Sequence, residues 1–236
     1  MSVLNKLNNS GQGWEEAYKA QALSKKNGAV APLWQEEAIP FLRDAKLIAL
    51  LKSQGVVRVL DAGAGDARNS FALAREGFFV VGLDIAPTAV ELAAEKALKE
   101  GNNHVVFMVG DVTRLNLTGP FDLVVSADTL GQLDDPHVAL EEFRRVLKPG
   151  GFLLFNLYST EDETYGAGRR IDENSFEYKG CVFRYFRESM AKEMTDGWNS
   201  VTIRSWSWMD PPHGDYRPKP HRHHSFVVLA QKPEEA

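Results

Sequence analysis

Carboxylates follow three consecutive apolar runs in the middle of the chain, and a glycine pair follows the first of them. Asp61 precedes Gly63 and Gly65, Asp84 ends the next run, and Asp111 comes shortly after a third. Glycines at such a turn let the backbone bend tightly and approach a ligand without a Cβ in the way. A pyrophosphate prefers bare N–H groups at a helix N-terminus, whereas an acid beside the turn favours a positively charged ligand. We therefore expect a site for a cationic ligand.

The apolar runs alternate with helical patterns, which predicts a doubly wound α/β fold. The predicted helices cover residues 68–76, 88–100 and 136–147, and the one at 88 opens with a capping-box pattern, Thr88-x-x-Glu91. Runs that are apolar throughout are typical of parallel strands with helices on both faces of the sheet. We predict seven mostly parallel strands, the last of them antiparallel, at residues 56–60, 79–83, 105–109, 121–126, 152–157, 201–208 and 225–230.

We expect a single domain over residues 1–236. Within it, residues 1–52 form an N-terminal helical cap and residues 53–158 form the ligand-binding core. Residues 159–236 form a substrate-side flap and the final strands, with a proline- and histidine-rich loop at 210–224. Ligands of such sheets bind at the carboxyl ends of the strands, so the side chains that end them should converge there.

The combined motifs resemble class I S-adenosylmethionine-dependent methyltransferases, which have a Rossmann-like sheet. The resemblance covers roughly residues 55–158 and rests on the acid–glycine turn, the two later acids, Phe121-Asp-Leu-Val-Val125 and Leu147-Lys-Pro-Gly-Gly151. It implies S-adenosyl-L-methionine as the cofactor and methyl transfer as the reaction.

The resemblance also implies cofactor-binding roles for particular positions. Asp84 would accept hydrogen bonds from both ribose hydroxyls, because a carboxylate offers two acceptor oxygens. Asp61 would attract the ammonium group, directly or through water. The other implied cofactor contacts are Ala62, Gly63, Gly65 and Asn69 around the turn, Ile85, Asp111 and Val112 around the adenine, and Ser126 and Ala127 beneath the methionine chain.

A narrower resemblance concerns the tellurite-resistance and thiopurine-type branch of these enzymes. It rests on Trp14-Glu-Glu-Ala-Tyr18, Pro32-Leu-Trp34 and the segment 67–78. It implies that Tyr18 and Trp34 close over the cofactor, where aromatic faces attract a desolvated cation. The alternative is that both residues only pack the N-terminal helix against the sheet. The tail after residue 160 departs from this branch, which leaves the substrate open.

Two other functions fit part of the pattern. Asp84 lies 19 residues after Gly65, a spacing that also suits the ribose-binding acid of a nicotinamide-dependent oxidoreductase. Two features argue against an oxidoreductase. Arg68 stands where the dinucleotide-binding motif has its third glycine, and Asp111 has no role in holding a nicotinamide dinucleotide. A non-catalytic adenosylmethionine-binding module would carry the same acids and lack turnover.

The tail holds the candidates for acid–base chemistry. A soft acceptor such as a thiol needs no base, whereas an oxygen acceptor usually does. His213, Tyr165 and His223 are the catalytic candidates, although the catalytic group itself stays unassigned. His221 and His223 would share one face of a strand and His224 the other. Because no acid is clearly paired with these histidines in the sequence, we expect no metal site.

The composition limits the partners and the cellular compartment that we expect for the chain. The net charge is −5 in 236 residues, which lacks the basic excess typical of nucleic-acid-binding proteins. The single cysteine, Cys181, excludes an internal disulfide. The chain shows neither a signal-peptide pattern nor an apolar run of about 20 residues. We expect a cytoplasmic monomer or homodimer that acts on a small molecule, with no nucleic-acid or membrane partner.

Overall fold

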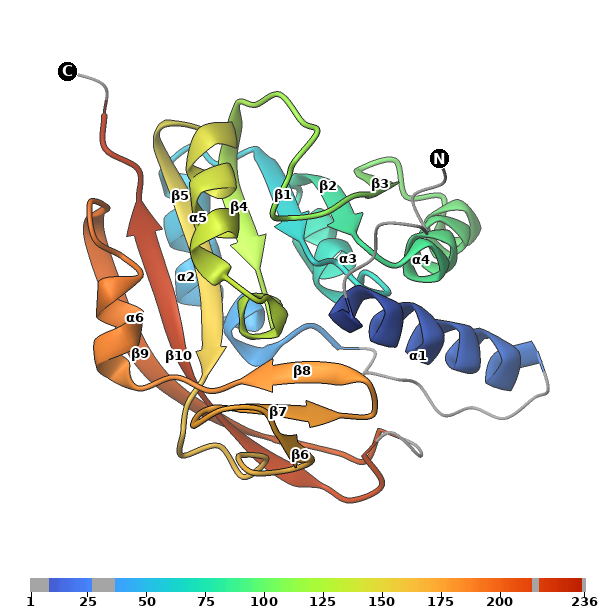
Figure 1. The fold of residues 1–236 in the computed structure, drawn as a ribbon. Coiled ribbons are helices and arrows are strands. Elements are labelled where there is room, and N and C mark those ends of the chain that lie inside the picture. Colours follow the sequence, from blue (N-terminus) through green and yellow to red (C-terminus); the bar gives the residue numbers. More distant parts are fainter. Residues whose placement is uncertain (1–8, 27–36, 214–216, 235–236) are drawn as a thin grey trace.

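The computed structural model describes residues 9–26, 37–213 and 217–234, and its centre is a seven-stranded sheet (Figure 1). Strands β1 to β5 are parallel, and β10 runs antiparallel to both of its neighbours, β5 and β9. The predicted doubly wound sheet with an antiparallel last strand is confirmed. Across the sheet the order is β3 (Val105–Val109), β2 (Phe79–Asp84), β1 (Arg58–Ala62), β4 (Phe121–Ser126), β5 (Leu147–Tyr158), β10 (His221–Gln231) and β9 (Asn199–Asp210).

Both faces of the central strands are buried, which explains why these strands are apolar along most of their length. Successive residues of β1 pack into different cores: Val59 joins one cluster and Leu60 the other. The first cluster includes side chains of α2 (Ala45–Ser53), α3 (Arg68–Arg75) and the short helix η2 (Pro40–Arg43). The second includes α5 (Pro136–Val146) and α6 (Glu188–Glu193), so helices cover the two faces (Figure 1).

Helix α4 (Pro87–Glu100) begins one residue earlier than predicted, and its cap differs from the expected one. The N-cap residue is Ala86, which makes no side-chain cap, and Pro87 is the first helical residue. The predicted capping box at Thr88 is therefore wrong. Thr88 instead donates its backbone N–H and its hydroxyl to Glu15 of α1 (Asn9–Lys26), at 3.0 and 2.8 Å. A carboxylate from a distant helix thus satisfies this helix start.

The chain after β5 forms a small second sheet and completes the large one. Strands β6 (Arg169–Arg170), β7 (Ser175–Tyr178) and β8 (Cys181–Arg184) make the small sheet, which packs with α1 and the start of α4 in a third core. The predicted 210–224 loop is partly wrong, because β10 already begins at His221 and pairs it with Asp210. In the described part of the chain, no helix combines the length and apolar character needed to cross a membrane.

Candidate functional site

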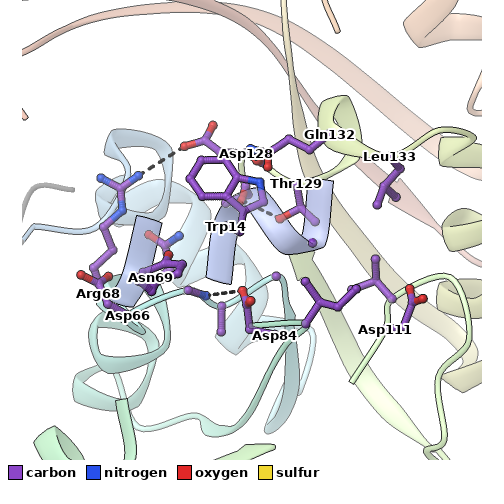
Figure 2. A pocket seen from close by; sticks show the side chains of 18 residues that line it. Trp14, Asp66, Arg68, Asn69, Asp84, Asp111, Asp128, Thr129, Gln132 and Leu133 are labelled. Carbon is purple, nitrogen blue, oxygen red and sulfur yellow. Dashed lines mark hydrogen bonds and ion pairs between the residues drawn. The ribbon is translucent and has the colours of Figure 1, made fainter. Parts of the chain in front are cut away.

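A pocket of about 850 Å³, part of it open to solvent, lies at the carboxyl ends of β1, β2 and β4 (Figure 2). The topology explains this position, because neighbouring connections diverge where the strand order reverses between β1 and β4. Helix α1 and the turn η3 (Leu130–Gln132) complete the walls. The lining residues are Gly11, Trp14, Tyr18, Gly63, Ala64, Gly65, Asp66, Arg68, Asn69, Asp84, Ile85, Asp111, Val112, Ala127, Asp128, Thr129, Gln132 and Leu133.

The turn after β1 requires glycine at two positions. Gly63 and Gly65 have φ values of +85° and +56°, which L side chains rarely adopt. A Cβ at Gly63 would lie 2.1 Å from the Thr129 hydroxyl oxygen, and a Cβ at Gly65 would lie 2.4 Å from the Tyr18 hydroxyl. The turn is therefore held closely between the β4 end and α1.

Asp84 is fixed by the same turn and still lines the pocket. Its Oδ2 accepts the Gly65 N–H at 2.8 Å and its Oδ1 accepts the Ala86 N–H at 2.9 Å. Burial raises the pKa of this carboxyl group, and the hydrogen bonds from Ala86 and Gly65 oppose the rise. Each carboxylate oxygen can accept more than one hydrogen bond, so Asp84 can also accept from a ligand.

Asp111 and its neighbours line another part of the pocket wall. Asp111 follows β3 and accepts hydrogen bonds from the backbone and the hydroxyl of Thr113 through one oxygen, at 2.8 and 2.7 Å. Ile85 and Val112 lie in the same wall and supply apolar surface beside this carboxylate. The combination can hold a flat ring by its faces and one polar edge by a carboxylate.

Two polar atoms are buried beneath the pocket without a hydrogen-bond partner in the described chain: Oδ1 of Asp61 and Oγ of Ser126. The other oxygen of Asp61 accepts from Ser70 Oγ at 2.6 Å. Burial raises the pKa of Asp61 to about 6, while the Ser70 hydrogen bond counteracts the rise. Buried polar groups are usually satisfied by protein, water or ligand, so these two atoms lack the partner that most such groups have.

The structure brings most of the predicted cofactor-binding residues to the pocket. The predicted residues that line it are Tyr18, Gly63, Gly65, Asn69, Asp84, Ile85, Asp111, Val112 and Ala127. Asp61, Ala62 and Ser126 lie buried at the strand ends and do not line it. Trp34 lies outside the described residues. Asn69 also has a local role, because its Oδ1 accepts the Ile39 N–H at 3.0 Å.

Several lining residues were not predicted from the sequence. Trp14 lies one helical turn before Tyr18, with the two ring centroids 6.4 Å apart, so the i, i+4 spacing would have identified it. Arg68 and Asp128 form an ion pair at 3.3 Å in the wall of the pocket. The charged lining residues are Asp66, Asp84, Asp111, Asp128 and Arg68, so acids outnumber bases and the pocket favours a cation.

None of the three catalytic candidates lines this pocket. Tyr165 is 39% exposed and donates its hydroxyl to the backbone oxygen of Glu173. His213 and His223 are buried, and both belong to a group of histidines and aspartates at the β9–β10 connection. His223 stacks on Tyr158 with ring centroids 4.7 Å apart, and Tyr158 lines a smaller cavity that shares Asp128 and Gln132 with the pocket.

Comparison with known proteins identifies the family. Residues 53–202 match the family model described as a methyltransferase domain. The chain belongs to this methyltransferase family. The matched segment contains the glycine turn, Asp84 at the end of β2 and Asp111 after β3, all of which line the pocket.

Individual relatives of the methyltransferase chain match shorter parts of it. A demethylmenaquinone methyltransferase from Clavibacter sepedonicus is 30% identical over 152 residues, which are 58% of this chain and 61% of that protein. The chain spans less than two thirds of the length of the first relatives it matches.

Solved structures of low sequence identity share the fold. TehB from Haemophilus influenzae superposes with a TM-score of 0.62 at 19% identity, over 90% of this chain and 66% of that one. A Burkholderia thailandensis 1,6-didemethyltoxoflavin-N1-methyltransferase, with 1,6-didemethyltoxoflavin and S-adenosylhomocysteine bound, superposes with a TM-score of 0.54 at 21% identity, over 80% and 78% of the two chains. At these identities the likeness concerns the fold alone.

Proposed function

We propose that this methyltransferase uses S-adenosyl-L-methionine and transfers its methyl group to a small-molecule acceptor. The observation that carries the proposal is the position of Asp84, whose two oxygens are held by the Gly65 and Ala86 N–H groups at the pocket wall. A vicinal diol needs two rigid acceptors side by side, and this carboxylate offers them.

The chain's own groups fit the remaining parts of the cofactor. Gly63 and Gly65 leave backbone surface where a Cβ would collide, which suits close packing of the methionine part. The Asp61 carboxylate, buried beneath the turn, suits the positive charge of the ammonium group, directly or through water. Asp111, Ile85 and Val112 suit the amino group and the faces of adenine. When bound, the cofactor supplies a methyl group on a positively charged sulfur.

The acceptor would enter beside Trp14 and the Arg68–Asp128 pair, which line the remaining wall. Asp128 is held firmly there, because it exchanges hydrogen bonds with Asn156 at 2.8 Å in both directions. The main work of these residues is to align the acceptor and exclude water, since reaction needs the attacking atom within about 3–3.5 Å of the methyl carbon.

Within the family, we infer from the residues of α1 that the chain is related to the tellurite-resistance and thiopurine-type branch. Its Trp14 and Tyr18 both line the pocket, and Tyr18 contacts the glycine turn. This placement supports the expectation that α1 closes over the cofactor. The shared fold with TehB is compatible with this assignment, and the acceptor of this chain stays open.

Isothermal titration of the full chain with S-adenosylhomocysteine tests the proposal. We expect binding of one molecule per chain and a loss of affinity of about tenfold or more for Asp84→Asn, since the amide removes an acceptor and places a donor against a backbone N–H. Asp134→Asn is the matched control, because Asp134 is exposed next to the lining residue Leu133. Its affinity should equal that of the wild type.

The outcomes of this titration separate the candidate functions. A folded wild type that binds neither S-adenosylmethionine nor S-adenosylhomocysteine would refute the proposal. Binding of reduced nicotinamide dinucleotide, read from quenching of tryptophan fluorescence, would indicate an oxidoreductase instead. Tight binding without turnover across thiol, amine and hydroxyl acceptors would indicate a non-catalytic module.

A further inference from the structure

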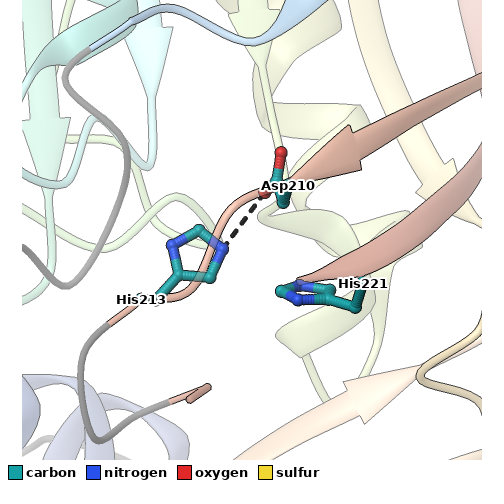
Figure 3. Close-up of side chains that lie close together, drawn as sticks. All are labelled: Asp210, His213 and His221. Carbon is teal, nitrogen blue, oxygen red and sulfur yellow. Dashed lines mark ion pairs between the residues drawn. The ribbon is translucent and has the colours of Figure 1, made fainter. Parts of the chain in front are cut away.

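A buried group of histidines and aspartates joins the ends of β9 and β10, apart from the pocket described above (Figure 3). Asp210 ends β9, His213 follows it, and His221 begins β10. One ligand-type atom from each of these three residues lies within 4.8 Å of the other two. All three are at least nine-tenths buried, with exposures of 6%, 2% and 7%.

The strand register explains why these side chains meet. Asp210 and His221 are direct partners in the antiparallel ladder, so they project from the same face of the sheet. His213 is held near them because its backbone pairs with that of Arg217. We expected no metal because no acid is clearly paired with these histidines in the sequence, but the fold places Asp210 beside His221.

We propose that Asp210, His213 and His221 bind a divalent transition-metal ion, and we take zinc as the representative ion. Two imidazoles and a carboxylate suit zinc and its neighbours, whereas magnesium and calcium prefer oxygen ligands throughout. Ligand atoms of a tetrahedral zinc ion lie roughly 3.3 Å apart, given bonds of about 2.0–2.1 Å. Asp210 Oδ2 and His213 Nε2 are already 3.2 Å apart.

The surroundings resemble the outer shell of a metal site. His223 Nε2 lies 3.1 Å from His221 Nε2 and 3.6 Å from Asp210 Oδ2, within reach to supply a fourth ligand. The other ring nitrogen of His223 lies 2.9 Å from Asp162 Oδ2. Carboxylates that orient the second nitrogen of a ligating histidine are usual in metal sites. With neutral imidazoles, the two buried carboxylates would also balance the charge of one divalent ion.

Such an ion would tie the β9–β10 connection to the sheet. Closed sites with four protein ligands are typically structural, and their binding energy stabilises the fold. The group lies behind Tyr158, whose ring stacks on His223 and lines the smaller cavity. The ion would therefore hold one wall of the acceptor side in place. This inference does not depend on the identity of the cofactor.

The test is titration of the chelator-treated full chain with Zn²⁺, followed by calorimetry and by thermal unfolding with and without the ion. We expect one ion per chain and a higher unfolding temperature. Asp210→Asn and His213→Gln should each weaken binding by at least about 100-fold, and Asp162→Asn by about 10–100-fold. His224→Gln is the matched control, since His224 is next on the strand and faces the other way; its affinity should not change.

Two results would overturn the proposal. One is the absence of stoichiometric Zn²⁺ uptake by the wild type, which would leave an Asp–His hydrogen-bond network alone. The other is uptake that Asp210→Asn, His213→Gln and His224→Gln leave equally intact. If the ligand variants fail to fold, Co²⁺ in the wild type replaces them: intense visible absorption bands that Zn²⁺ abolishes would support the site, and their absence would refute it. Titration of the same sample with S-adenosylhomocysteine reports the proposed function separately.

Discussion

At the residue scale, the pocket depends on contacts that leave no room for a single added carbon. Gly65 combines a positive φ with a Tyr18 hydroxyl at 2.4 Å from the position of a Cβ. These two costs differ in origin: the first is local backbone strain, and the second is a collision with α1. They can therefore be separated by mutation.

We expect Gly65→Ala to destabilise the protein by more than the roughly 1 kcal/mol that a left-handed alanine costs. Gly101→Ala supplies that reference, because Gly101 has φ +61° and nothing within 4 Å of the added Cβ. Tyr18→Phe should recover part of the loss in Gly65→Ala, since the next nearest atom of the ring is 3.5 Å away. The free energies of unfolding in urea are compared for the wild type, Gly65→Ala, Gly101→Ala and the double variant Gly65→Ala/Tyr18→Phe. Equal losses for the two glycine variants would contradict the predicted collision.

Asp61 should make cofactor binding depend on pH. Burial raises its pKa to about 6 in the free protein, so the carboxyl group is mostly ionised at pH 7 and mostly protonated at pH 5. Only the ionised form attracts an ammonium group, so affinity is lost as the pH falls through 6. We expect S-adenosylhomocysteine to bind about tenfold more weakly at pH 5 than at pH 7. Titrations across this range with the wild type and Asp61→Asn measure the effect, and an unchanged pH profile in the variant would exclude Asp61 as its source.

At the scale of elements, α1 is attached to the core through the start of α4. Glu15 is buried and accepts both the N–H and the hydroxyl of Thr88, where α4 lacks a side-chain cap of its own. A carboxylate at this end also interacts favourably with the helix dipole. The contact therefore stabilises two helices, and one of them lines the pocket.

We expect Glu15→Ala to lower the free energy of unfolding by about 1–2 kcal/mol, because it removes a buried cap. Glu16→Ala is the control, since Glu16 is largely exposed and its surface pairing with Lys19 should contribute little to stability. Hydrogen exchange should show lower protection of α1 in Glu15→Ala than in Glu16→Ala. Equal protection in both variants would mean that α1 is held mainly by its apolar packing against β8.

At the scale of the whole molecule, the pocket joins segments that are far apart in sequence, from Gly11 to Leu133. Its walls come from α1, the ends of β1, β2 and β4, the residues after β3, and η3. A ligand there contacts parts that separate completely on unfolding. Ligand binding should therefore stabilise the whole fold.

We expect S-adenosylhomocysteine at 100 times its Kd to raise the unfolding temperature by roughly 5–10 °C. The value follows from about 2.7 kcal/mol of binding stabilisation and about 2–4 °C per kcal/mol for a chain of this size. Differential scanning fluorimetry with reduced nicotinamide dinucleotide as the comparison ligand measures it. A higher unfolding temperature with the dinucleotide and an unchanged one with S-adenosylhomocysteine would refute the methyltransferase proposal and favour an oxidoreductase.

The sequence by itself determined the sheet and one side of the pocket. The predicted strands 105–109 and 121–126 have the observed bounds, because both are short runs rich in apolar and β-branched residues. The acids and glycines come directly after such strands, so their convergence follows from the topology. Apolar strand runs, strand-end acids and glycine turns are local sequence patterns, and the strands and helices alternate regularly along the chain.

Tertiary structure alone decided the remaining contacts. Glu15 caps α4, Asp128 pairs with Arg68, and Asp210 lies beside His221. No sequence pattern indicates that these residues come into contact. The side-chain direction along a strand reverses with a shift of one residue, so only the folded register places Asp210 beside the histidines. Local periodicity determines which elements form, whereas packing and register determine which of their polar groups meet.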